Sequence, residues 1–189
     1  DAFDAIFMRV MREKVLPILE NNGVDLVLCG HSHVYERSYL INKHYGQSTT
    51  FNHSTMLIDS TSGNPDSNRS YLKYTYGANK GKGTVYAVVG NSGKSESENG
   101  KMHPVMYKKY AADKGVGSMI LEVQGNVLTA TYYKETGEVF DKFRILKQDT
   151  TSIISGIKNN SSVNELKVYP NPFTNSLIVE FDAKEIKPT

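Results

Sequence analysis

The sequence predicts an α/β fold in which a helix leads into a buried strand and the main domain closes with an antiparallel meander. Three observations support this class. Apolar residues recur at helical spacing over residues 5–22, the runs at 24–28 and 85–89 are almost wholly apolar, and alternating runs separated by glycine turns fill residues 117–147. These are the patterns of an amphipathic helix, of strands buried on both faces, and of paired antiparallel strands.

The helix predicted over residues 5–22 carries one apolar face. This face is formed by Phe7, Val10, Met11, Val15, Ile18 and Leu19, which recur at intervals of three and four residues. Pro17 is expected to disturb the helix because it has no backbone N–H, and Gly23 is expected to end it in the left-handed conformation. The strand predicted over Val24–Leu28 follows at once, which favours a sheet buried on both faces.

The middle of the chain alternates between polar and apolar segments. Residues 42–82 are polar and predict long loops around one strand, Thr55–Ile58, whereas Val85–Val89 predicts a further buried strand. The meander is predicted to consist of strands Ser118–Val123, Val127–Tyr133 and Val139–Leu146, joined by turns at Gln124–Asn126 and Glu135–Gly137.

The composition changes after the meander. Over Gln148–Asn164 Ser, Thr, Asn and Gly dominate and the isoleucines show no period, which predicts a linker. Beyond it, Leu166–Phe173 and Ser176–Phe181 are strand-like pieces that flank a Pro-Asn-Pro turn.

The overall composition is that of an ordinary soluble globular protein, with 39% hydrophobic and 22% charged residues. The net charge of +2 indicates neither a nucleic-acid nor a membrane partner. No apolar run approaches the ~20 residues that span a bilayer. The 189 residues suffice for one domain and an appendage, and because they begin at Asp1 we expect an internal piece of a longer protein.

The strongest chemical signal lies where the first strand ends. Gly30 permits a sharp exit and is followed by His31 and His33, which in extended backbone project from the same face. Strands that open through glycine into neighbouring imidazoles often place metal ligands at the carboxyl edge of an α/β sheet. Imidazole also ligates as a neutral ring at ordinary pH. His31 and His33 are therefore predicted metal ligands; a pair of surface histidines is the alternative.

Other reactive residues are interpreted as structural. Cys29, the only cysteine, excludes an intrachain disulfide and is read as a small hydrophobic residue rather than a nucleophile. Gly90–Ser95 has two residues rather than four between its glycines, so a turn is favoured over a phosphate loop. Histidines in polar segments are predicted to lie at the surface, and the clustered tyrosines are predicted to pack rather than to bind carbohydrate. These residues are His44, His53, His103, Tyr71, Tyr74, Tyr76, Tyr107 and Tyr110.

The run Gly30–Arg37, Gly-His-Ser-His-Val-Tyr-Glu-Arg, resembles the last metal-binding motif of the calcineurin-like metallophosphoesterases. The Gly-His-x-His-x-Tyr-Glu-Arg form is similar to that of the purple acid phosphatases. The resemblance extends upstream to the helix around Met8-Arg9 and downstream to the strand and glycine turn at Gly83–Gly93, and covers residues 1–147.

This resemblance implies two sheets packed face to face with helices outside, and metal-dependent hydrolysis of phosphate esters. It implies a dinuclear centre of ferric iron with zinc, manganese or ferrous iron, in which His31 binds the divalent ion and His33 the ferric ion. Tyr35, Glu36 and Arg37 are then candidates for orienting the ligands. No catalytic residue is assigned.

The other ligand motifs of that family are not found in the chain. Gly90-Asn91 is followed by Ser92 and so does not supply the Gly-Asn-His motif. The remaining ligands are expected upstream of Asp1, and the chain alone is expected to be inactive. Substrate identity is not readable from the sequence.

The tail carries a second resemblance. Val168–Pro172, Val-Tyr-Pro-Asn-Pro, followed by an alternating strand, resembles the start of the sorting domain of type IX secretion cargo in Bacteroidetes. It implies a secreted or cell-surface protein with the secretion machinery as a partner. The expected organisation is the C-terminal part of a catalytic domain at 1–147, a linker at 148–163 and a truncated sorting domain at 164–189.

Two other functions stay open. The chain can belong to a non-catalytic secreted β-rich binding module in which His31 and His33 are structural. It can also belong to a metallophosphoesterase that acts on diesters or nucleotides.

Overall fold

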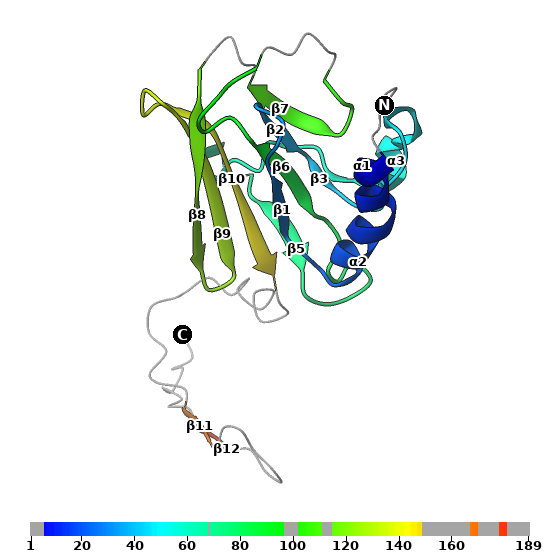
Figure 1. Ribbon diagram of the computed structural model, residues 1–189. Helices are drawn as coiled ribbons and strands as arrows, with labels where there is room; N and C mark the ends of the chain where they lie inside the picture. The colour runs from blue at the N-terminus through cyan, green and yellow to red at the C-terminus, as the bar shows by residue number, and fades with distance from the viewer. Residues whose placement is uncertain are drawn as a thin grey trace. The chain divides into compact units, whose positions relative to one another are not determined.

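The computed structural model describes residues 6–67, 69–96, 102–110, 115–148, 167–169 and 178–180 (Figure 1). The chain divides into two compact units, Asp1–Ser152 and Ile153–Thr189, and each is described by itself.

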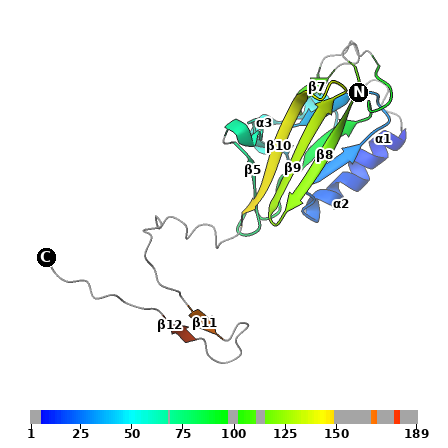
Figure 2. The same cartoon turned by 90° about the vertical axis from the view of Figure 1, so that its left-hand side faces the viewer.

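Two four-stranded sheets face each other in the first unit (Figures 1 and 2). The first sheet has the order β1-β6-β2-β7, with β1 at Leu26–Cys29, β2 at Tyr35–Ser38, β6 at Val85–Val89 and β7 at Met106–Tyr110. The second has the order β5-β10-β9-β8, with β5 at Tyr71–Tyr74, β8 at Gly117–Gln124, β9 at Val127–Lys134 and β10 at Val139–Gln148. β1 runs parallel to β6, and β2 lies antiparallel between β6 and β7.

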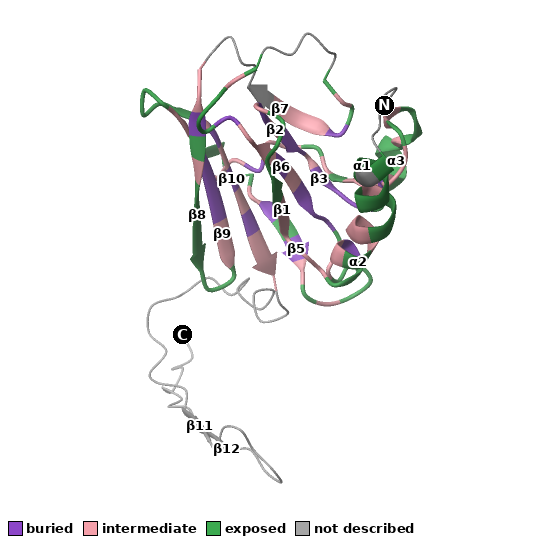
Figure 3. Cartoon of the chain, in the orientation of Figure 1, coloured by how far each residue is buried: buried purple, intermediate pink, exposed green. Residues whose placement is uncertain are grey.

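The core lies between the two sheets. One buried cluster contains residues of both sheets together with Leu40, and its members are Leu40, Tyr71, Val85, Ala130, Phe143 and Ile145. Figure 3 shows buried positions along the strands of the two facing sheets and mostly exposed positions on the helices. The predicted fold class, a two-sheet α/β sandwich with outer helices that ends in an antiparallel meander, is confirmed.

The N-terminal helix is continuous but changes its winding. It consists of α1 at Ile6–Val10, a π-helical turn at Met11–Val15 and α2 at Leu16–Asn21. The wide turn ends two residues before Pro17, which cannot donate an N–H to the preceding turn. Gly23, at φ +71°, ends the helix as predicted, and its N–H donates to Glu20 O at 2.9 Å.

The predicted burial of this region is only partly found. Of the predicted apolar face, Val10, Met11 and Ile18 are 47%, 53% and 60% exposed, and the side chain of Phe7 lies outside the described part. The first strand begins at Leu26 rather than Val24, and burial of this strand on both faces is wrong. Within the described residues β1 pairs with β6 alone, so it forms the edge of the sheet and its last residues, Leu28 and Cys29, are exposed.

The polar middle segment holds more structure than predicted. Residues 55 and 56 belong to a helical turn, α3 at His53–Met56, because the Asn52 side chain accepts the Ser54 N–H at 2.9 Å and caps it. The strand β4 follows at Leu57–Asp59 and pairs with β3 at Leu40–Ile41. Short 3₁₀ turns lie at Ser48–Thr50 and Pro65–Ser67.

Strand β5 was not predicted because its inward positions include a lysine. Lys73 is buried, and its ammonium donates to the carbonyl oxygens of Gly23 and Val24 at 2.8 and 2.7 Å. It also pairs with Asp25 at 3.1 Å, so the charge is compensated inside the sandwich.

The meander agrees with the prediction. β8 pairs with β9, and β9 with β10, each antiparallel, and the two turns place Gly125 and Gly137 at φ +55° and +83°.

In the second unit, β11 at Lys167–Tyr169 pairs antiparallel with β12 at Ile178–Glu180. Apart from Gln148, the predicted linker and the Pro-Asn-Pro turn lie outside the described residues. None of the helices in the described ranges is long and apolar enough to cross a membrane.

Candidate metal-binding site

His31 and His33 lie on the short connection between β1 and β2. This connection leaves the carboxyl end of β1 and enters β2 at Tyr35. His31 is exposed, and 32% of the His33 side chain is exposed, so both imidazoles are accessible from solvent at this end of the first sheet.

The sequence predicts extended backbone at His31 and His33. The connection instead makes two tight turns. Ser32 N–H donates to Gly30 O at 3.0 Å, and Val34 N–H donates to Ser32 O at 2.8 Å. Each bond spans three residues, and His31 at the centre of the first turn has φ +73°. This is the geometry of a γ-turn that is rare for residues other than glycine. Strain of this kind is concentrated at functional sites, where the surrounding structure maintains it.

The turn that follows β6 packs against the connection that carries the two histidines. Gly90 N–H donates to Val34 O at 3.1 Å. A Cβ atom on Gly90 would lie 1.9 Å from the carbonyl oxygen of Ser32, so only glycine permits this approach. The segment interpreted as a turn instead of a phosphate loop therefore packs directly on the predicted metal motif.

The same segment then brings a carboxylate to His33. Glu96 N–H donates to His33 O at 3.1 Å, and Glu96 Oε1 lies 2.8 Å from His33 Nδ1. Lys94 lies 2.9 Å from the same oxygen, and Lys94 first, then His33, lowers the pKa of Glu96. The Nδ1–Oε1 contact has ion-pair distance without full hydrogen-bond alignment, and Nδ1 is buried. Of the two ring nitrogens, Nε2 is therefore the one left to bind an ion.

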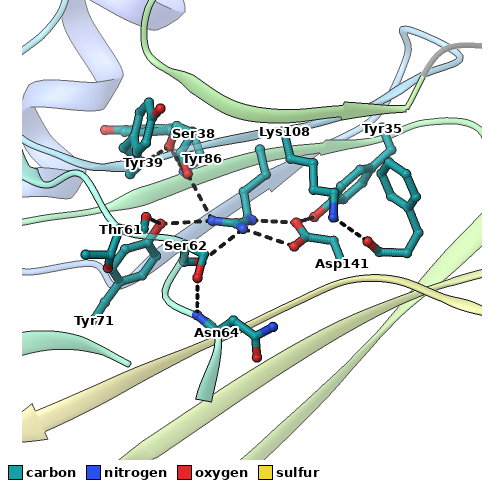
Figure 4. Close-up of polar contacts among 12 residues, drawn as sticks. Tyr35, Ser38, Tyr39, Thr61, Ser62, Asn64, Tyr71, Tyr86, Lys108 and Asp141 are labelled. Atoms are coloured by element: carbon teal, nitrogen blue, oxygen red, sulfur yellow. Dashed lines mark hydrogen bonds and ion pairs between the residues drawn. The ribbon is translucent and has the colours of Figure 1, made fainter. Parts of the chain in front are cut away.

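Tyr35 and Arg37 point into the core rather than towards the histidines. The Arg37 guanidinium donates to Asp141, to the Tyr71 hydroxyl and to the Ser62 carbonyl, and these three partners are labelled in Figure 4. Arg37 donates to both oxygens of Asp141, at 2.6 and 3.0 Å, and Tyr35 donates to Asp141 at 2.7 Å. These bonds fix β2 to β10 of the opposite sheet. Glu36, between them, is half-buried on the other face of β2. A role for the three residues in orienting the ligands stays a prediction.

A side-chain hydrogen bond also holds the turn after β6 in place. Asn91 is fully buried, and its side-chain oxygen accepts the Tyr132 hydroxyl at 2.9 Å. The Tyr132 ring stacks on Tyr35, with centroids 4.1 Å apart. One aromatic pair therefore anchors both the strand after His33 and the turn before Glu96.

The donor set suits a transition metal only in part. Neutral imidazoles are ordinary ligands of zinc and iron. The described residues contain no group of three His, Cys, Asp or Glu side chains that can hold an ion. His31 and His33 can therefore supply only part of a metal site, and its other ligands must come from elsewhere.

The other predicted residues take several environments. His44 is buried, so its predicted surface position is wrong; its ring packs against Phe51 and His103, at centroid distances of 5.2 and 5.6 Å. His53 is exposed as predicted, and His103 is half-buried. Tyr71 packs in the core as predicted, and Tyr107 lies 4.5 Å from the Arg37 guanidinium.

Sequence reasoning missed Glu96 and Asp141. Each lies far along the chain from its partner, in a segment with no recognisable motif. Glu96 and Asp141 are identified only by their contacts with distant segments, and no local sequence pattern predicts those contacts.

Comparison with known proteins supports the fold. No family model matches the chain. Two uncharacterized proteins from two strains of Mycobacterium tuberculosis are each 33% identical over 94 residues, which are 50% of this chain and 15% of theirs. The chain thus spans only a small part of these relatives.

The solved purple acid phosphatase from yellow lupin (Lupinus luteus) seeds superposes with a TM-score of 0.51. It shares 23% sequence identity, and the match covers 75% of this chain and 21% of that one. The chain therefore has a phosphoesterase-type fold.

Proposed function

We propose that this chain supplies part of the dinuclear metal site of a phosphatase of the purple acid type. The observation that carries the proposal is the position of Gly30–Arg37. The motif that resembles the family's last metal motif forms a strained, accessible turn at the carboxyl end of β1, on a fold similar to that of a purple acid phosphatase.

In this proposal each residue has a limited task. His31 binds the divalent ion, which is zinc, manganese or ferrous iron, and His33 binds the ferric ion. Bound ions of this kind polarise the phosphate ester and promote attack by water. The Gly90 contact with Ser32 and the Tyr35–Asp141 bond hold the backbone on either side of His33. The remaining ligands and the walls of the substrate pocket come from outside this chain.

The test is hydrolysis of p-nitrophenyl phosphate by the purified full-length protein. We expect activity that a chelator removes and added metal restores, and that His31→Ala and His33→Ala each abolish. His53→Ala is the matched control, because it removes an exposed histidine on α3. Hydrolysis of a diester or nucleotide alone would favour the other phosphoesterase reading. A wild-type protein with no metal-dependent hydrolysis would favour the binding module.

We also propose that residues 164–189 begin a secretion signal. The proposal rests on the resemblance of Val168–Pro172 to the type IX sorting domain, and the antiparallel pairing of β11 with β12 is compatible with a β-rich tail. Deleting everything after Gln148 from the full-length protein should preserve phosphatase activity and retain the protein in the cell envelope. Unchanged export from the native host would refute the sorting role.

A further inference from the structure

We propose that Glu96 is a positioning residue for His33: its carboxylate holds the Nδ1 side of the ring so that Nε2 is the atom presented to a metal ion. The inference rests on the proposed function and assigns a residue on the segment after β6 to the same site.

Two separate contacts join Glu96 to His33. The carboxylate oxygen lies 2.8 Å from Nδ1, and the backbone N–H of Glu96 donates to the His33 carbonyl at 3.1 Å. One residue thus contacts both the ring and the backbone of His33. A contact by a freely moving surface side chain would not be accompanied by this backbone bond.

The segment that carries Glu96 is held at its start as well. Gly90 N–H bonds to Val34 O, and the buried Asn91 side chain accepts the Tyr132 hydroxyl. Lys94 contacts the same Glu96 oxygen at 2.9 Å, which favours the charged carboxylate. The path from β6 to Glu96 is therefore fixed to the histidine connection at Val34 and again at His33.

The chemistry of imidazole gives this contact its meaning. A neutral ring carries its proton on one nitrogen and its lone pair on the other. A carboxylate beside Nδ1 favours the proton there, leaves the lone pair on Nε2 and makes that nitrogen a better ligand. Nδ1 is buried whereas 32% of the side chain is exposed, so Nε2 is also the nitrogen better placed to meet an ion.

The competing interpretation is an ordinary surface ion pair. The Glu96 side chain is 53% exposed, and exposed pairs usually contribute little to stability. That interpretation expects Glu96 substitutions to change nothing at His33.

The experiment measures the affinity of the full-length protein for ferric iron, the ion assigned to His33, by titration against a competing iron chelator. Glu96→Ala should weaken binding about 10- to 100-fold, the effect typical of residues that orient a metal-ligating histidine. Glu96→Gln should weaken it less, because an amide oxygen can still lie beside Nδ1–H, although without the negative charge of the carboxylate. Glu138→Gln is the matched control: it breaks another exposed lysine–glutamate pair, with Lys134 at 2.7 Å, and should leave affinity unchanged. Unchanged affinity in Glu96→Ala would overturn the proposal.

A second readout separates this inference from the proposed function. Ring ¹⁵N shifts of His33 in metal-free protein report which nitrogen carries the proton. We expect the Nδ1–H tautomer in the wild type and a mixture in Glu96→Ala. If the wild type bound no metal, the proposed function would fail. A tautomer that still changed in Glu96→Ala would support the positioning of the ring, and an unaltered tautomer would refute it.

Discussion

Arg37 and Asp141 form a doubly hydrogen-bonded ion pair between the two sheets, Nε to Oδ2 at 2.6 Å and Nη2 to Oδ1 at 3.0 Å. Their side chains are 0% and 4% exposed. The guanidinium carbon of Arg37 lies over the rings of Tyr107 and Phe143, 4.5 and 4.7 Å from their centroids. The strand that leaves the histidine turn is therefore attached to the opposite sheet by a charge pair with almost no access to water.

Removing one member of this pair should be strongly destabilising. Asp141→Ala leaves a buried guanidinium without its carboxylate, which typically costs about 3–5 kcal/mol. The free energy of unfolding, measured in denaturant, should fall by that amount. Asp66→Ala removes an exposed carboxylate that contacts Lys142, and should cost under ~1 kcal/mol. Equal losses in the two variants would show that the Arg37–Asp141 pair is not the anchor.

Gly90→Ala should disturb the histidine turn directly. The new Cβ would lie 1.9 Å from Ser32 O, a backbone atom that cannot rotate away. We expect a loss of about 1–3 kcal/mol in stability, as in other overpacked sites, together with weaker metal binding. Gly93→Ala is the matched control, because no atom lies within 4 Å of its added Cβ. A Gly90→Ala protein with unchanged stability and metal affinity would exclude the contact between the two turns.

Tyr71 should make the protein sensitive to alkali. Burial raises the pKa of its hydroxyl to about 12. The folded state keeps this proton above pH 10, where the unfolded state loses it, so stability falls as the pH rises from 10 through 12. Between pH 9 and pH 11 this group should account for about 1.3 kcal/mol of the loss. Denaturant titrations at both pH values should show a smaller loss in Tyr71→Phe; an equal loss would contradict the assignment.

His44 should make the protein sensitive to acid. Burial first, and His103 and Arg12 second, lower the pKa of its ring. The unfolded state therefore binds a proton more readily, and stability should fall as the pH drops below about 6.5. Neither ring nitrogen has a hydrogen-bond partner among the described residues, so His44→Leu should be neutral or stabilising at pH 7. Stability of His44→Leu that falls as steeply as the wild type between pH 7 and pH 5 would refute this account.

The sequence was sufficient where local pattern decides the structure. The meander and Gly23 were predictable, because strand alternation and a left-handed helix end depend on neighbouring residues. The strand β5 was not predictable, because the charge of the buried Lys73 is compensated by carbonyl oxygens 49 and 50 positions away in the chain. The exposure of Leu28 was also not predictable, since an apolar strand has the same sequence pattern at the edge of a sheet as at its centre.

In the candidate site, too, features set by local sequence were predictable and features set by distant contacts were not. His31 and His33 were identified from their spacing after Gly30 and the motif around them. The backbone at His31 was not, because its γ-turn depends on the Gly90 turn that packs beneath it. Burial of His44 likewise results from contacts with Phe51 and His103, which no periodic pattern in the sequence predicts.

We expect His31 and His33 to ligate metal ions, and anomalous X-ray scattering at the iron and zinc edges tests this claim. Crystals of the full-length, metal-loaded protein should show anomalous peaks within about 2.0–2.2 Å of an imidazole nitrogen of each histidine, with Nε2 of His33 the one facing its ion. Peaks elsewhere with none at these two rings would contradict the claim.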